Sequence, residues 1–147
     1  MSIFSNLFKK RPKLKVQTDI GEFTLVHKSG SKNLWSNEEL EIPSTVRGTE
    51  KNPESTHVDF LKSINKEIEK LSQEITEKFL KEFREAELPL NFNSWEERLK
   101  IVGLEVMMMY ENKAYWNLTF EDTKAPYAHF TIFNEAVKIN QDFAIDT

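Results

Sequence analysis

The stretch from Pro53 to Ala86 constrains the fold of this chain most strongly, because it predicts one long amphipathic helix. Its apolar residues recur at intervals of three or four, the spacing that lines one face of a helix: Leu61, Ile64, Ile68, Leu71, Ile75, Phe79 and Phe83. No glycine or proline interrupts residues 54–87. The rest of the chain is therefore expected to supply the surface that covers this apolar face.

Both ends of the predicted helix carry sequence signals. The side chain of Asn52 can accept a hydrogen bond from the first free amides, and Pro53 suits the first helical position. At the other end, Leu88 precedes Pro89 and is pushed out of the α-helical region. We therefore expect a helix that begins at about Pro53 and ends before Pro89.

A helix of this length raises a question of size. It would span about 50 Å, against roughly 30 Å across a compact domain of this chain length. The helix must then bend, break, overhang the body or meet a second copy. The heptad-like steps are too few for a coiled coil, so we expect the helix to pack on its own sheet and we favour a monomer. Its polar side chains are expected to face solvent: Lys62, Lys66, Glu69, Lys70, Gln73, Glu77 and Lys81.

Composition places the chain among ordinary globular proteins. It has 147 residues, of which 39% are hydrophobic, and it has no cysteine, which excludes disulfides and thiolate metal sites. No segment has the apolar length of a membrane span, and the N-terminus lacks the pattern of a secretory signal. These features predict a cytoplasmic protein without membrane attachment.

Charge is distributed unevenly along the chain. Five cations precede the first acid, Asp19, so the remainder carries a net charge of -9 within a total of -4. An acidic body is a poor surface for nucleic acid, so we expect no nucleic-acid partner. Residues 1–13 form a predicted basic tail in which Ile3, Phe4, Leu7 and Phe8 share one face. This tail is expected to dock on its own domain or stay loose rather than bind a membrane.

Residues 14–147 are expected to form a single α+β domain. Before the helix, period-two alternation predicts a hairpin from Leu14 to His27 with its turn at Gly21-Glu22, a second turn at residues 29–32, and strands near Trp35 and Val46. Pro43 places the strand near Val46 at an edge or bulge. After the helix, Ser94 and Glu97 form a capping box that begins a short helix, which Gly103 closes.

The C-terminal part predicts a four-stranded antiparallel meander. Alternating residues run from Leu104 to Tyr110, from Ala114 to Phe120, from Tyr127 to Phe133 and from Ala136 to Ile145. Antiparallel meanders that flank one long helix indicate an α+β fold in which one sheet face is buried against that helix. The run Met107-Met108-Met109 favours a strand covered on both sides over an adaptable binding surface.

Little in the sequence points to catalysis. His27, His57 and His129 have no partner at metal-ligand helical spacing, and the chain has no nucleophile elbow and no glycine-rich phosphate loop. We therefore expect no enzyme activity, no metal and no cofactor. The adjacent acids Glu121 and Asp122 are expected to be solvated, and Trp95 is a candidate anchor for a partner.

A resemblance to a family adds to these observations. The order of Gly21 and Phe23 in a hairpin, Trp35 after the next turn, a proline-led helix and a closing meander with residues 129–134 resembles small bacterial domains of unknown function that often occur near polymorphic-toxin immunity genes. Those domains tend to have an acid before the histidine and a glycine after it, where this chain has Ala128 and Phe130. The resemblance implies a non-enzymatic cytoplasmic binding protein and assigns no catalytic residue.

Two functional hypotheses follow. The first is a non-catalytic protein-binding module of the immunity type, whose acidic body occupies the basic surface of a partner toxin. The alternative is a small-ligand-binding protein or enzyme that uses His129 and neighbouring aromatic residues. The candidate residues for a partner or ligand surface are Trp95, Tyr127, His129, Glu121 and Asp122.

Overall fold

The computed structural model describes residues 13–27, 33–139 and 142–146. The side chains of His27 and Tyr127 fall outside this description. So do the apolar residues of the predicted tail and the turn at residues 29–32, so these predictions stay untested.

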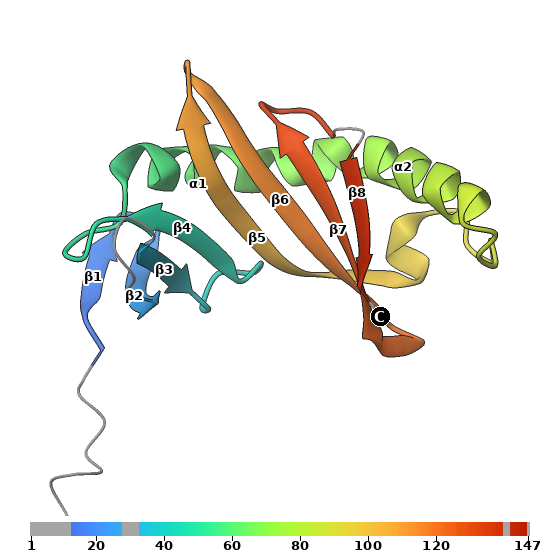
Figure 1. Cartoon of the computed structure of the whole chain (residues 1–147), viewed down its shortest axis with the longest axis horizontal. Coiled ribbons are helices and arrows are strands. Elements are labelled where there is room, and N and C mark those ends of the chain that lie inside the picture. Colours follow the sequence, from blue (N-terminus) through green and yellow to red (C-terminus); the bar gives the residue numbers. More distant parts are fainter. Residues whose placement is uncertain (1–12, 28–32, 140–141, 147) are drawn as a thin grey trace, which may run out of the picture.

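The described chain forms one sheet and one helical layer (Figure 1). The first four strands are β1 (Lys15–Thr18), β2 (Gly21–His27), β3 (Asn33–Asn37) and β4 (Ser44–Gly48). The helical segment consists of α1 (Ser55–Glu67), the 3-10 turn η2 (Ile68–Leu71) and α2 (Ser72–Glu85). The 3-10 turn η3 (Trp95–Glu97) follows, and then β5 (Leu99–Tyr110), β6 (Lys113–Asp122), β7 (Ala125–Glu135) and β8 (Asp142–Asp146). This arrangement is the α+β fold that the sequence predicts.

All eight strands belong to one sheet, in which they lie in the order of the sequence. Neighbouring strands are antiparallel except for β4 and β5, which run parallel and pair Ser44 with Leu104 and Val46 with Val106. This exception has a simple cause, because the helical segment carries the chain across one sheet face between these two strands. The two predicted meanders are thus halves of a single sheet. β4 is an interior strand, so its predicted place at an edge was wrong; it begins just after Pro43.

The apolar stripe of the helical segment packs on one face of the sheet. All seven predicted stripe residues are buried, and they meet a core built from every strand except the peripheral ones. Phe79 is at the centre of an aromatic cluster: its ring lies 4.8 Å from Phe120, 5.9 Å from Phe130 and 5.5 Å from Phe143. The seven polar residues predicted to face solvent are all exposed. The amphipathic pattern therefore predicted both faces of this segment.

The length of the helix is accommodated by a break. The 3-10 turn η2 interrupts it between α1 and α2, and Ile68 and Leu71 within the turn remain buried. The first helical residue is Ser55 with Glu54 at the N-cap, so the predicted start was wrong: Pro53 instead forms a bridge with Gly48. The last helical residue is Glu85, and the Leu88 N–H donates to the Phe83 carbonyl at 2.8 Å while Glu87 adopts a φ of 55°. This is the geometry of a Schellman cap, which ends the helix ahead of Pro89.

The predicted short helix from Ser94 is only the single 3-10 turn η3. The Ser94 side chain makes no cap hydrogen bond, and the Glu97 carboxylate accepts from the Asn93 N–H instead. Leu99 and the residues after it enter β5, which pairs along its whole length with β6. Gly103 therefore stands inside a strand rather than at a helix end, because sheet pairing overrides the local helical signal.

A bulge in β5 changes the predicted faces of the methionine run. The register with β6 shifts between Val106 and Met108, so Val106 is fully buried while Met108 is 49% exposed. Met109 consequently faces Ala114 and packs against the core. Unbroken alternation from Leu104 to Tyr110 would place Val106 and Met108 on one face, but one extra residue in a strand reverses every side chain after it. The expectation that the methionine run is covered on both sides was wrong, because Met108 is exposed.

His57, in the first turn of α1, ties the parallel strands together. It is 6% exposed, its Nδ1 accepts from the Arg47 N–H of β4 at 3.3 Å, and it is hydrogen-bonded to the backbone of Val106 in β5. Burial lowers the pKa of His57 and nearby Arg47 adds to this effect, whereas Glu54 and the bond to Val106 act in the opposite direction. The neutral imidazole thus joins β4, β5 and α1.

Candidate functional site

The face of the sheet that points away from the helical segment has no described element over it. Figure 1 shows the long strands β5, β6 and β7 crossing in front of the helical layer, which lies behind them. Side chains alternate between the two faces along each strand, so the pairing registers show which residues share this helix-free face. We use the term helix-free face for the rows of residues described next.

The registers give three main cross-strand rows on the helix-free face. The first row crosses Thr45, Glu105, Asn117, Phe133 and Asp142. The second crosses Gly103, Thr119, Thr131 and Ala144. The third crosses Lys100, Glu121, His129 and Asp146. The face is therefore mainly polar, with carboxylates in its first and third rows.

Apolar side chains gather toward the β5–β6 turn on the same face. Met108 pairs with Tyr115 next to the first row, and the Met107 sulfur lies 3.5 Å from the amide nitrogen of Asn117. Met108 is exposed and Tyr115 is partly exposed. Methionine and aromatic side chains beside charged groups are the residue types that protein interfaces favour.

Some carboxylates of the helix-free face are paired with a cation and others are not. Glu105 pairs with Arg47 at 2.8 Å, and Glu135 pairs with Lys113 at 2.8 Å. Within the described part of the chain, Asp142 and Asp146 of these rows form no ion pair. The face thus keeps uncompensated negative charge, which attracts basic groups at long range.

A small hollow opens on this face where β4, β5 and β6 run side by side. Its volume is about 230 Å³. The lining includes Glu38, Thr45, Gly103, Glu105, Asn117 and Thr119. The hollow therefore lies on the first two rows and is lined largely by hydrogen-bond acceptors.

Two of the predicted surface residues lie together on the helix-free face. His129 and Glu121 are cross-strand neighbours, with 3.8 Å between Nε2 and Oε1, and their side chains are 44% and 32% exposed. Tyr127 belongs to β7, but its side chain lies outside the described part. Neither His129 nor Glu121 lines the hollow.

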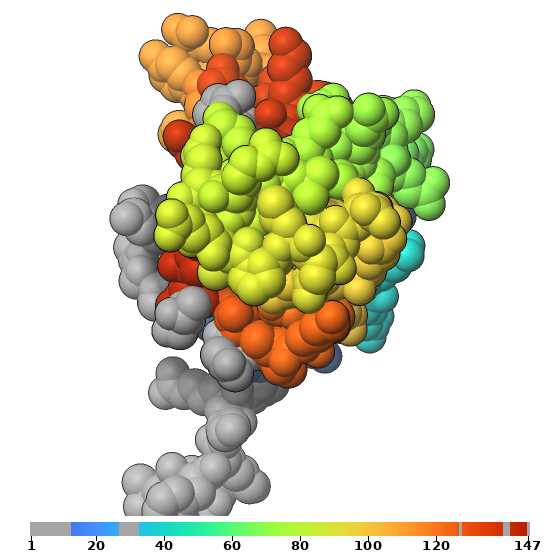
Figure 2. Space-filling view, turned by 90° about the vertical axis from the view of Figure 1, so that its right-hand side faces the viewer, coloured from blue at the N-terminus to red at the C-terminus, as the bar shows by residue number. Residues whose placement is uncertain are grey.

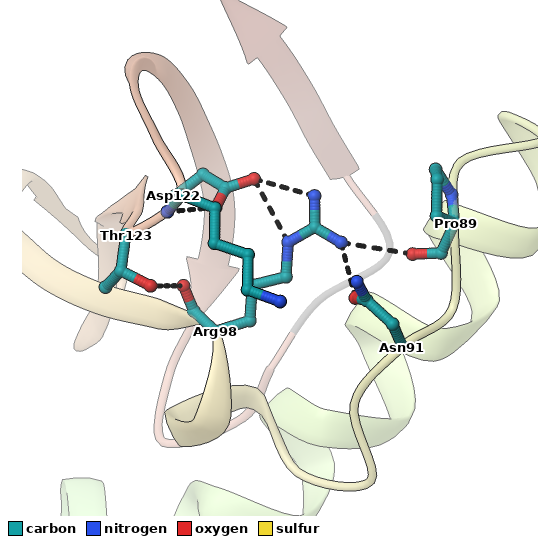
Figure 3. A network of polar contacts seen from close by, with 6 residues as sticks. Pro89, Asn91, Arg98, Asp122 and Thr123 are labelled. Carbon is teal, nitrogen blue, oxygen red and sulfur yellow. Dashed lines mark hydrogen bonds and ion pairs between the residues drawn. The ribbon is translucent and has the colours of Figure 1, made fainter.

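Asp122 is not on this face, and the expectation that it is solvated was wrong. Its side chain is 3% exposed and its Oδ2 accepts from Arg98 Nη2 at 2.9 Å and Nε at 3.1 Å (Figure 3). Burial acts to raise the pKa of Asp122, but hydrogen bonds from Arg98 and the Lys124 N–H outweigh it, so the pKa is lowered. The burial of Asp122 could not be predicted from the sequence. Adjacent strand residues face opposite sides, and only the strand register shows which of the two is buried.

Arg98 is a structural residue that the sequence analysis did not single out. Its Nη1 donates to the Asn91 side chain at 2.6 Å and to the Pro89 carbonyl at 3.2 Å, while its own carbonyl accepts from Thr123 at 2.7 Å (Figure 3). Figure 2 looks onto this end of the molecule, where α2, the segment after it and the β6–β7 turn form one continuous surface. The cluster fixes these three pieces rather than presenting a free charge.

Trp95 also makes structural contacts within the domain. Its indole N–H donates to the Ser72 hydroxyl at 3.0 Å, its backbone N–H donates to Thr76 at 3.2 Å, and its ring lies 5.4 Å from Phe120. The side chain is only partly exposed. It anchors η3 to α2, and it lies on the helix side of the sheet with Phe120 rather than beside His129.

The described residues contain no group of three or more side chains placed to hold a metal ion. Among the described helices, none combines the length and apolar content that crossing a bilayer requires. Comparisons of the chain with protein-family models, with curated proteins and with solved structures find no match.

Proposed function

We propose that this chain is a non-catalytic protein-binding module that uses the helix-free face to bind a partner with a basic surface. The observation that carries the proposal is the composition of that face. It joins exposed Met108 and partly exposed Tyr115 to carboxylates, of which Asp142 and Asp146 form no ion pair within the described part of the chain. Methionine and aromatic side chains beside charged groups suit a protein partner.

Charge complementarity favours a basic protein as the occupant. The chain outside its basic first residues carries a net charge of -9. An acidic surface speeds the encounter with a basic partner and makes binding sensitive to salt. An immunity-type protein that covers the basic nucleic-acid-binding or catalytic surface of a toxin fits this description, in line with the family resemblance of the sequence.

A matched pair of charge reversals tests the proposal. One variant replaces Glu121 and Asp146 on the helix-free face by Lys, and the other replaces Glu69 and Glu77 on the exposed side of the helical segment by Lys. Both variants change the net charge equally. In pull-downs from the native host, we expect a specific partner that is retained by the helix variant, lost by the sheet variant and weakened by high salt.

The same comparison can refute the proposal. A partner that is lost equally with both variants would bind through overall charge, and a partner retained by the sheet variant would bind elsewhere. The competing prediction of a catalytic or small-ligand role rests on the contact between His129 and Glu121, since a carboxylate can orient an imidazole. That role requires His129→Ala to abolish an activity found in a substrate screen.

A further inference from the structure

β8 forms one edge of the sheet, and no described strand lies along its outer side. It is the last strand in the sheet order, and it pairs with β7 continuously from Asp142 opposite Phe133 to Asp146 opposite His129. The register of these pairs has no shift. A regular edge strand of this kind is a template on which one more strand can pair.

The hydrogen-bond alternation of an antiparallel sheet identifies the backbone groups on the outer side of β8. The N–H of Ala136, just after β7, donates to a β6 carbonyl at 2.8 Å, so every second residue counted back from Ala136 bonds to β6. The residues between them bond to β8, and one of these is Thr131, which pairs with Ala144. Ala144 therefore points its N–H and C=O toward β7, whereas Phe143 and Ile145 point theirs away from the sheet.

The side chains of Phe143 and Ile145 make this edge partly apolar. Both lie on the helix side of the sheet, opposite the buried residues Ile132 and Phe130. The Phe143 ring lies 5.5 Å from Phe79 and is partly exposed, and Ile145 is 45% exposed. The edge thus offers main-chain hydrogen bonds together with apolar side chains to be covered, which are the two features that strand addition uses.

Asp142 and Asp146 decide which kind of strand fits. Both side chains are exposed on the helix-free side of β8. In a second copy paired antiparallel along the whole strand, each Asp142 would face Asp146 of the other copy, and like charges directly opposite each other destabilise a sheet. Lys or Arg at the same places of an added strand would instead form opposite-charge pairs.

We propose that the outer edge of β8 binds an extended basic segment of the protein partner as an additional strand. The segment alternates apolar residues, which cover Phe143 and Ile145, with Lys or Arg residues, which pair with Asp142 and Asp146. The inference rests on the proposed function, because it names the element by which the basic partner engages this end of the helix-free face.

A synthetic peptide tests the edge without the partner. The probe is the acetylated, amidated peptide Lys-Val-Thr-Val-Lys, in which the lysines lie on one side of an extended chain and the valines on the other. The control peptide, Lys-Lys-Thr-Val-Val, has the same composition and charge. In solution NMR we expect saturable shifts and slower hydrogen exchange of the Phe143 and Ile145 amides, with about tenfold weaker binding of the control, whose side chains do not alternate. Equal shifts with both peptides would overturn the inference.

Two substitutions of Ile145 separate the backbone from the side chain. Ile145→Pro removes the outward N–H but no bond between β8 and β7, so the protein should stay folded and lose the shifts that the peptide induces. Ile145→Thr keeps the N–H and a β-branched side chain, so it should retain saturable binding. Undiminished binding by a folded Ile145→Pro protein contradicts the inference. Asp142→Lys leaves the backbone intact and should weaken peptide binding several-fold, which gives a second check if the proline variant does not fold.

Light scattering over a range of concentrations tests a second copy as the occupant of the edge. We expect the wild-type protein and Ile145→Pro to have the same mass. A wild-type dimer that Ile145→Pro converts to a monomer would place another copy of this chain on β8 and overturn the inference of a basic segment.

The partner experiment separates this inference from the proposed function. If a folded Ile145→Pro protein keeps the partner binding that the sheet charge reversal abolishes, the protein-binding function stands and the edge site is wrong. If the peptide binds β8 but the sheet charge reversal has no effect on a partner, the proposed function fails and strand addition at β8 remains.

Discussion

At the scale of single residues, the buried ion pair of Asp122 and Arg98 joins several segments of the described structure. Removing one member of a buried pair leaves the other charge unpaired, which costs about 3 kcal/mol or more. We therefore expect Asp122→Asn to lower the free energy of unfolding by about 3 kcal/mol in urea denaturation. Glu121→Gln, on the adjacent and more exposed residue, should change it by less than about 0.5 kcal/mol. Equal changes in the free energy of unfolding of the two variants would show that the Asp122–Arg98 ion pair does not stabilise the fold.

His57 gives the fold a dependence on pH. Because the pKa of His57 is lowered from 6.5, the unfolded chain binds a proton at a higher pH than the folded chain does. The free energy of unfolding should therefore fall as pH drops below 6.5, by up to about 1.4 kcal/mol per pH unit until the folded pKa is reached.

Denaturation series at pH 7.5 and 5.5 measure this effect. His57→Gln removes the titrating group and should flatten the decline, although the variant is less stable at neutral pH. His129→Gln leaves His57 in place and should keep the wild-type decline. A decline that persists undiminished in His57→Gln would assign the pH dependence to other groups.

The methionine run shows why some residue faces were hidden from the sequence. Alternation predicts faces correctly only while the strand register is unbroken, and the shift between Val106 and Met108 has no local sequence signal. Asp122 was misjudged for a different reason, since its partner Arg98 comes from a segment predicted as helix. Both errors concern contacts between separate segments of the chain, which residue-by-residue patterns do not contain.

At the scale of elements, the helical segment owes its place to its apolar stripe. Ile68 in the 3-10 turn is 8% exposed and belongs to the core. Ile68→Asp would bury a charge and remove a core side chain, so we expect it to cost about 4 kcal/mol or more and to unfold much of the protein. Circular dichroism and light scattering measure folding and mass together.

Gln73→Asp is the matched control for this prediction. It introduces the same charge in α2 at an exposed position, so the protein should remain folded with a loss below about 1 kcal/mol. A folded Ile68→Asp monomer derived from a wild-type dimer would instead show that the stripe mediates dimerisation.

The elements themselves were predictable to different degrees. The periodicity of the helical segment and the alternation of the long strands specified their type, because each pattern repeats over several turns or residues. The parallel contact of β4 with β5 was not predictable, because it joins residues separated by the entire helical segment. The capping box at Ser94 predicted a short helix that does not form. Sheet pairing extends to Leu99 and overrides this local signal.

At the scale of the whole molecule, one layer of helix covers one face of the sheet, and no described element lies over the other face (Figure 1). The sequence identified Glu121 and His129 as surface candidates, and the structure places both on the helix-free face. The hollow with Asn117 and Gly103 was not predicted, because β4 contributes to it through the unforeseen parallel pairing.

The most direct test of the helix-free face as a binding surface is methyl NMR of the methionines with the captured partner. Met107 and Met108 lie at this face, whereas Met109 packs against the core and is an internal control in the same strand. Single Met→Leu variants assign the signals. We expect partner binding to shift or broaden the Met107 and Met108 methyl signals and to leave Met109 nearly unchanged. Binding that leaves both the Met107 and Met108 signals unchanged would contradict the account.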